Sequence, residues 1–115
     1  MTALQPMLNR PLVLEARERL PDGAGGYAET WRALGTHWAE VRPRRGRAAE
    51  RDALPAARVP VEIVVRAMPP GRPGRPQPEQ RFREGPRAYR IEAVTEADPG
   101  ARFLVCHAVE EEISP

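Results

Sequence analysis

Hydrophobic and polar residues alternate along several short segments of the chain, and the clearest case is the stretch Gly25–Pro43. From Thr36 onward, one side of this stretch carries Thr36, Trp38, Glu40 and Arg42, and the other carries His37, Ala39 and Val41. A period of two is typical of a β-strand. The same stretch holds Trp31 and Trp38, the two tryptophans of a chain with only 5% aromatic residues. We therefore predict that both tryptophans anchor the core and that the remaining strands surround them.

Alternation also predicts the other strands. The expected strands cover residues 12–17, 27–41, 59–68, 82–84, 89–94 and 102–109. The side chains expected to face the core are Leu12, Leu14, Val59, Val61, Ile63, Val65, Tyr89, Ile91 and Ala93. Residues 102–109 are apolar on both faces, which is typical of a central or interface strand. One face carries Phe103, Val105, His107 and Val109, and the other carries Leu104, Cys106 and Ala108.

Glycine and proline mark the connections between these strands. The cluster 22–26 predicts a hairpin turn between the first two strands, and Leu34-Gly35 predicts a bulge or bend in the second. Pro60 cannot donate a ladder hydrogen bond, so its end of the third strand is expected at a sheet edge or a bulge. Residues 69–78 contain five prolines and are expected to form a stiff loop. Further turns are expected at 85–86 and 98–100.

These elements predict an all-β protein. The expected fold is a small antiparallel β-barrel of five or six strands with long loops and at most one short helix, around residues 48–54. A chain of 115 residues can bury one core, so residues 1–115 are expected to form a single domain. Residues 1–10 are expected to be an extended lead-in, because Pro6 and Pro11 prevent a helix of any length.

Charge changes this picture at two places. The formal net charge is only +2, and all 18 basic residues are arginine. Residues 44–58 nevertheless concentrate Arg44, Arg45, Arg47, Arg51 and Arg58 against Glu50 and Asp52. An acidic tail, 110–115, begins with Glu110, Glu111 and Glu112. This asymmetry is compatible with a head-to-tail contact between copies or with nucleic acid at the basic end, and two solvated charge clusters remain the simpler interpretation.

The residue pattern does not predict catalysis, a metal site or a cofactor. The single cysteine and the two histidines lack metal-ligand spacing, and Cys106 and His107 point to opposite faces of one strand. Cys106 is expected to be a buried thiol in a reducing compartment. No apolar run reaches the roughly 18 residues of a membrane span, and the N-terminus lacks the apolar segment of a signal peptide. We expect a non-enzymatic protein that is made and folded in a cytoplasm.

The central motif resembles that of the phage head–tail joining proteins, also described as the head-closure, stopper or head–tail adaptor family. It consists of Gly25, Gly26, Glu29, Thr30 and Trp31, then Trp38, Ala39, Val41 and Pro43, and then Gly46 and Arg47. A strand ending at Arg66, a second from Tyr89 and a final apolar strand follow in the family's order. The similarity covers about residues 9–110, and the proline-rich loop and Pro60 depart from the pattern.

This resemblance implies a small β-barrel that forms a homo-oligomeric ring below the portal and its adaptor, in a phage or a gene transfer agent particle. Such a ring closes the DNA-filled head and offers a surface to tail terminator or tail proteins. The family's long loop after the Trp-bearing strand corresponds to residues 44–58. The resemblance therefore implies that the arginines of this loop face packaged double-stranded DNA without reading its sequence. We expect Glu110–Glu112 to contact a basic patch on a neighbouring subunit or ring.

A stand-alone nucleic-acid-binding barrel of the OB or SH3-like kind is the main alternative. Such a barrel needs solvent-facing aromatic side chains on which bases can stack. Trp31 and Trp38 are expected in the core or at a subunit seam, which counts against this alternative.

Overall fold

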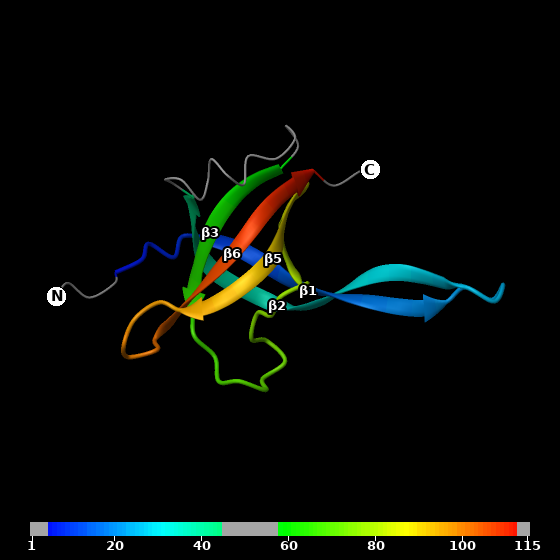
Figure 1. Cartoon of the computed structure of the whole chain (residues 1–115), viewed down its shortest axis with the longest axis horizontal. Coiled ribbons are helices and arrows are strands. Elements are labelled where there is room, and N and C mark those ends of the chain that lie inside the picture. The colour runs from blue at the N-terminus through cyan, green and yellow to red at the C-terminus, as the bar shows by residue number, and fades with distance from the viewer. Residues whose placement is uncertain (1–4, 45–57, 113–115) are drawn as a thin grey trace.

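The computed structural model describes residues 5–44 and 58–112, which form six antiparallel strands (Figure 1). The strands are β1 (Arg10–Pro21), β2 (Tyr27–Pro43), β3 (Arg58–Arg66), β4 (Arg81–Glu84), β5 (Arg87–Glu96) and β6 (Phe103–Glu112). They close a barrel in the order β1-β2-β3-β6-β5-β4, and β4 pairs back with β1. The predicted all-β barrel is confirmed. No helix occurs in 5–44 or 58–112, and the helix expected around 48–54 lies outside the described residues.

One set of alternating side chains fills the inside of the barrel. The core consists of Leu12, Leu14, Ala39, Val61, Ile63, Val65, Phe82, Tyr89, Ile91, Leu104, Cys106 and Ala108. Phe82 and Tyr89 are the largest of the fully buried side chains. Because the interior of a small barrel is narrow, two aromatic rings leave room only for small side chains at positions such as Ala39 and Ala108.

The prediction that Trp38 anchors the core is wrong. Trp38 is 57% exposed, whereas Ala39 beside it is fully buried. The alternation predicted for β2 is therefore confirmed, but the opposite face points inward. Trp31 is partly buried and lies outside the core cluster. Val59, which was also expected to point inward, is 49% exposed at the beginning of β3.

Two bulges change the direction of side chains. In the β1–β2 pair, Leu14 lies opposite Gly35 and Glu15 lies opposite Ala33, so Leu34 is the additional residue. Gly35 has a φ of 138°, which a glycine adopts easily, and the bulge predicted at Leu34-Gly35 is confirmed.

The second bulge lies in β5 and was not predicted. Ile91 lies opposite Ala108 and Ala93 lies opposite His107, so Glu92 is the additional residue. The extra residue reverses the alternation beyond it. As a result Val94 packs against the core, and the prediction that Ala93 faces inward is wrong.

Pro60 lies neither on an edge strand nor in a bulge. β3 pairs with β2 on one side and with β6 on the other, without a shift in register. The ladder with β2 ends at Pro43 opposite Val61, and beyond it the Arg44 N–H donates to the Pro60 carbonyl at 3.4 Å. Pro60, which has no N–H group to donate, therefore lies just beyond the end of the ladder between β2 and β3. The proline-rich segment lies in the loop between β3 and β4, as predicted.

The barrel closes through a short seam between β1 and β4. The two strands pair only over Val13–Glu15 and Arg81–Arg83. An ion pair stands at each end of this seam, with Arg10 contacting Glu84 at one end and Arg81 lying 2.7 Å from Glu15 at the other. The hydrogen bond from Arg10 holds the pKa of the Glu84 carboxyl below its usual value. Glu15 is only 8% exposed, so its charge depends on Arg81 for compensation.

β1 and β2 extend far beyond their pairing with the rest of the barrel. β3 pairs with β2 only over Ala39–Pro43, so residues 16–21 and 27–32 pair only with each other. They form a two-stranded ribbon, here called the arm, which projects from one side of the barrel (Figure 1). The predicted hairpin between the first two strands is confirmed, but its outer half contributes nothing to the barrel core.

Replacing Trp38 should leave the fold nearly as stable as before, because more than half of its side chain already contacts water. Phe82→Ala, by contrast, removes a fully buried ring and should cost about 3–5 kcal/mol of the free energy of unfolding. Urea unfolding of Trp38→Ala and Phe82→Ala checks this contrast. A loss for Trp38→Ala as large as that for Phe82→Ala would show that the tryptophan is a core residue after all.

Removing Arg81 should destabilise the protein by about 3 kcal/mol, because the Glu15 carboxylate would stay largely buried without its partner. The matched control is Arg32→Ala, which breaks the exposed pair with Glu18 (3.3 Å) and should cost less than about 1 kcal/mol. Thermal unfolding of Arg81→Ala and Arg32→Ala measures both effects. Equal losses in the two variants would contradict a special role for the seam.

Candidate interface surfaces

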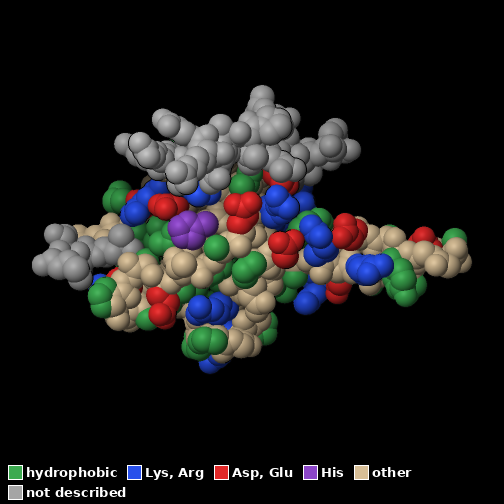
Figure 2. All heavy atoms as spheres, viewed as in Figure 1, with side chains coloured by type: hydrophobic (Ala, Val, Ile, Leu, Met, Phe, Trp, Pro, Cys, Tyr) green, Lys and Arg blue, Asp and Glu red, His purple; other side chains and the backbone are tan. Residues whose placement is uncertain are grey.

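One face of the arm carries arginine and aromatic side chains side by side. Arg17 lies opposite Trp31 and Pro21 lies opposite Tyr27, and opposite residues of an antiparallel pair share a face. The Arg17 guanidinium lies 5.3 Å from the centre of the Trp31 ring, and the Arg19 guanidinium lies 4.6 Å from that of Tyr27. Figure 2 shows basic and acidic side chains interspersed along the arm. These contacts stiffen a ribbon that has little other packing.

Trp31 joins the arm to the seam of the barrel. The Arg81 guanidinium lies 4.0 Å from the centre of the Trp31 ring while it also contacts Glu15. The ring therefore shields the Glu15–Arg81 ion pair from water on the outside of the barrel, which strengthens the pair. The prediction that Trp31 anchors the core is therefore wrong, because its ring packs against the Arg17 and Arg81 side chains outside the core cluster.

The tip of the arm is a tight turn held by Asp22. Its Oδ1 accepts hydrogen bonds from the N–H groups of Ala24 (2.8 Å) and Gly26 (3.1 Å). A Cβ on Gly26 would lie 3.0 Å from the Asp22 carboxylate, so a larger residue here would require that carboxylate to shift. Beside the turn, Leu20 is 47% exposed and Tyr27 is 62% exposed. The tip is therefore a fixed loop with apolar side chains that face water.

The other motif residues divide between the arm and the barrel. Glu29 lies on the arm and contacts Arg17 at 3.3 Å, and Thr30 lies opposite Glu18. Val41 packs against the core, and Pro43 is the last residue of β2. The motif thus specifies both the arm and the strand that connects it to the barrel.

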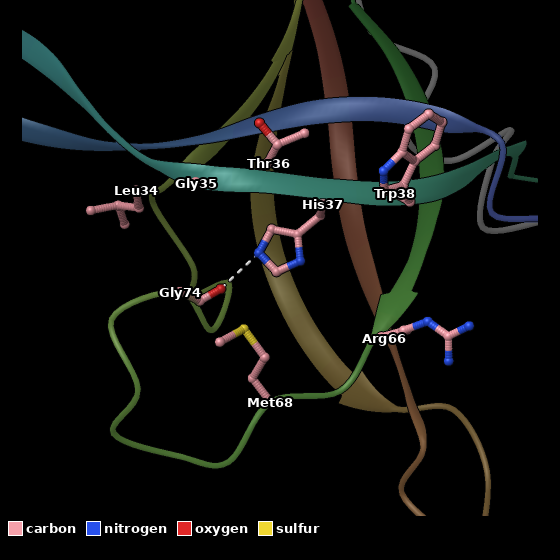
Figure 3. A pocket seen from close by; sticks show the side chains of 8 residues that line it. All are labelled: Leu34, Gly35, Thr36, His37, Trp38, Arg66, Met68 and Gly74. Carbon is pink, nitrogen blue, oxygen red and sulfur yellow. Dashed lines mark hydrogen bonds between the residues drawn. The ribbon is translucent and has the colours of Figure 1, made fainter.

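A pocket of about 360 Å³ opens where the arm meets the barrel (Figure 3). It lies between 34–38 of β2 and three residues from the end of β3 and the following loop, Arg66, Met68 and Gly74. β2 pairs with β1 along one edge, but β3 joins its other edge only from Ala39 onward, so no strand within 5–44 and 58–112 lies beside that second edge at 34–38. The apolar residues that line the pocket are Leu34, Trp38 and Met68, and the Trp38 ring lies on the opposite side of β2 from His37 and Met68 (Figure 3).

His37 attaches the proline-rich loop to β2. Its Nε2–H donates a hydrogen bond to the Gly74 carbonyl (2.7 Å), and its ring stands edge-on to Phe82 at 5.7 Å. Arg75 donates from Nη1 to the Met68 carbonyl (2.6 Å) and braces the same loop. Burial lowers the pKa of His37, although the bond to Gly74 acts in the opposite direction. The imidazole is therefore neutral at pH 7, and the loop keeps a fixed position beside the pocket.

The predicted DNA-channel residues lie mostly outside the described part of the chain. Arg45, Arg47 and Arg51 belong to the undescribed segment 45–57. Arg44 follows the end of β2, and Arg58 is the first residue of β3. The structure therefore brings the two ends of this segment together at one end of the barrel, through the contact between Arg44 and Pro60.

Residues 110–112, expected to begin an acidic tail, are the last residues of β6. Glu110 contacts Arg87 at 2.6 Å, and Glu111 lies 3.5 Å from Arg90. In the β3–β6 register Glu111 lies opposite Arg58, so the acidic and basic segments share one end of the barrel. The structure therefore does not place these two segments at opposite ends of the molecule, the arrangement that would favour a head-to-tail contact.

The described residues contain neither a cluster of metal ligands nor an accessible thiol. No group of three or more His, Cys, Asp or Glu residues within 5–44 and 58–112 is placed to hold a metal ion. Burial raises the pKa of the Cys106 thiol to about 12, which keeps it protonated and unreactive. The described part of the chain also contains no helix that is long and apolar enough to cross a membrane.

Sequence reasoning missed the arm and the pocket. The signal for the arm was present in the length of the second strand, 27–41, which exceeds the predicted length of every neighbour. Alternation reports a strand but not how many strands pair with it. No sequence pattern indicated the pocket, because its lining residues come from two segments that are far apart in the chain.

The lowered pKa of His37 predicts that acid destabilises the protein through this residue. In the unfolded chain histidine titrates near its ordinary pKa of about 6.5. Below that pH the unfolded state binds more protons than the folded one. The contribution of His37 is therefore fully present above about pH 6.5 and is lost as the pH falls toward the folded-state pKa. Urea unfolding at pH 7.5 and 5.5 should show a smaller loss for His37→Gln than for the unmodified protein, and identical losses would contradict this.

The sequence model of the phage head completion protein family matches residues 4–112. Among solved structures, a chain from the virion of a native gene transfer agent particle is 48% identical to this chain. The match covers 96% of this chain and 100% of that one, with a TM-score of 0.73. The solution structure of a protein from Shigella flexneri 2a shares the fold, with 20% identity, a TM-score of 0.60 and coverage of 91% and 92%.

A comparison with curated protein sequences gives no match. The family match nevertheless spans nearly the whole chain and includes the arm, the pocket and all six strands. This chain therefore belongs to the phage head completion protein family.

Proposed function

We propose that this chain is a structural, non-catalytic component of a tailed phage or gene transfer agent particle, assembled in the bacterial cytoplasm. It forms a ring below the portal and its adaptor, closes the DNA-filled head and offers a surface to tail proteins. The observation that carries this proposal is the family match over residues 4–112. The 48% identity to a chain from a gene transfer agent virion, over 96% of this chain, supports the same assignment.

The arginines of residues 44–58 line the DNA channel of this ring. The support is chemical, since Arg44, Arg45, Arg47, Arg51 and Arg58 outnumber the two acidic residues of the segment. A ring repeats this excess of positive charge in every subunit. Arginine contacts to phosphate groups do not read base sequence, which suits a part that holds any packaged DNA.

Glu110, Glu111 and Glu112 contact a basic patch of a neighbouring subunit or ring in this proposal. Arg87 and Arg90 already engage two of these carboxylates within the chain. Surface pairs of this kind contribute little stability, so the carboxylates can exchange partners at small cost.

One observation favours the alternative, a stand-alone nucleic-acid-binding barrel. The rings of Tyr27 and Trp38 are exposed. The two rings lie on the same strand, eleven residues apart, which corresponds to roughly 36 Å in extended chain. Successive bases cannot stack on rings at that separation. Titration with single-stranded DNA separates the two functions, because the alternative requires quenching of Trp38 fluorescence and a weaker complex in Trp38→Ala.

Replacing Arg44, Arg45, Arg47 and Arg51 by serine should leave the barrel folded and the particle assembled, but filled heads should lose DNA before tails attach. The reason is the loss of four phosphate contacts in each subunit. The measurement is the nuclease-sensitive DNA fraction of purified heads. The control replaces exposed arginines that lie outside this segment and away from the tip, Arg32, Arg83 and Arg102, and should retain DNA. Normal retention in the first variant would remove residues 44–58 from the channel.

A further inference from the structure

The tip of the arm presents apolar side chains that no described residue covers. Leu20 and Tyr27 lie beside the Asp22 turn, and about half or more of each side chain is exposed. Residues 16–21 and 27–32 carry the tip roughly 20 Å beyond the last strand pair that belongs to the barrel. An apolar tip on a stiff, projecting ribbon exposes hydrophobic area that contact with another surface would bury.

The pocket at the base of the arm has the complementary properties. Its walls of Leu34, Trp38 and Met68 are apolar, and its volume is about 360 Å³. Such a size falls within the range of protein pockets that bury a ligand group. The edge of β2 that faces away from β1 has no partner strand there among the described residues and can accept main-chain hydrogen bonds from an incoming turn.

The charges around the two surfaces also match. The tip, residues 20–28, carries one formal charge, the carboxylate of Asp22. The segment 66–78, which forms the other side of the pocket, carries Arg66, Arg72 and Arg75 and no acidic residue. The Arg19 guanidinium lies 4.6 Å from the Tyr27 ring, so charge favours the approach of the Asp22 side of the turn, and not of the whole tip, to this basic rim.

The tip and the pocket of one chain cannot meet. Both lie on β2, with Tyr27 at the tip and Leu34 at the pocket, and the extended strand between them holds them roughly 23 Å apart. The tip that enters the pocket therefore comes from a second copy of this chain. A contact between two different surfaces of identical chains is heterologous, and it generates a ring when the rotation between copies closes.

We propose that the tip of the arm of one copy, with Leu20 and Tyr27, seats in the pocket formed by Leu34, Trp38 and Met68 of the next copy. This contact would be the subunit interface of the ring, and the inference rests on the proposed function. It assigns a role to the exposed Trp38 as one wall of an intersubunit site. Glu110–Glu112 are then not required for ring closure.

Cross-linking in assembled particles tests this contact. The double variant Ala28→Cys/Thr36→Cys places one thiol at the tip and one at the pocket, both at exposed positions, without removing an apolar side chain of either surface. The native Cys106 is fully buried and does not react. A short bismaleimide should give a ladder of covalent multimers of this chain. The single variants and the matched control Ala28→Cys/Arg83→Cys, whose second thiol lies on β4, should give none.

Adding Leu20→Ser and Tyr27→Ser to the double variant should lower the multimer yield about tenfold, because the tip then lacks its apolar anchors. DNA retention is measured in the same particles. Particles that contain the chain and hold DNA, but yield only monomers or a cross-link to a different protein, would overturn the contact and leave head closure standing. Particles that fill and retain DNA without the chain would overturn the proposed function and the contact with it.

Discussion

Closure of the barrel depends on the seam between β1 and β4. Three residue pairs join these strands, fewer than between any other two neighbouring strands of the barrel, and the β4–β5 hairpin follows with four. The two ion pairs at its ends, Arg10–Glu84 and Glu15–Arg81, compensate for this short ladder. Arg10 also donates to the hydroxyl oxygen of Tyr89 at 3.0 Å and so connects the seam to a core ring. If the seam opened, Leu12 and Phe82 would lose their cover and β1 and β4 would expose free edges.

The alternation of polar and apolar residues predicted most of the barrel, because a strand with one solvent-exposed face and one buried face must show this pattern. It succeeded where the pattern was uninterrupted, as for Leu12 and Leu14 in β1. It failed at Trp38 because the period is the same for either orientation, and the narrow interior selected the alanine. It failed at Ala93 because one inserted residue, Glu92, reverses every side chain beyond it. The acidic end was misread because glutamate is uncommon in strands, and cross-strand arginines override that preference here.

The candidate surfaces depend on contacts that local pattern does not contain. Arg10 and Glu84 are separated by 74 positions in the chain, and the pocket combines β2 with the loop after β3. The family motif indicated the correct segments, since Gly26 closes the arm turn and Trp31 covers the seam. The contacts of each residue follow only from the register of the sheet, which the bulges and the strand lengths determine together.

The contact between Arg44 and Pro60 has an evolutionary consequence. The chain leaves β2 and returns to β3 between strands that are already neighbours, at an interstrand spacing of roughly 4.8 Å. The barrel therefore constrains neither the length nor the composition of the segment between them. Doubling the length of such an insertion costs only about 0.6 kcal/mol of closure entropy. Mutation can thus lengthen, shorten or recharge this segment while the barrel stays folded, which lets related particles diverge at this position without redesigning the subunit.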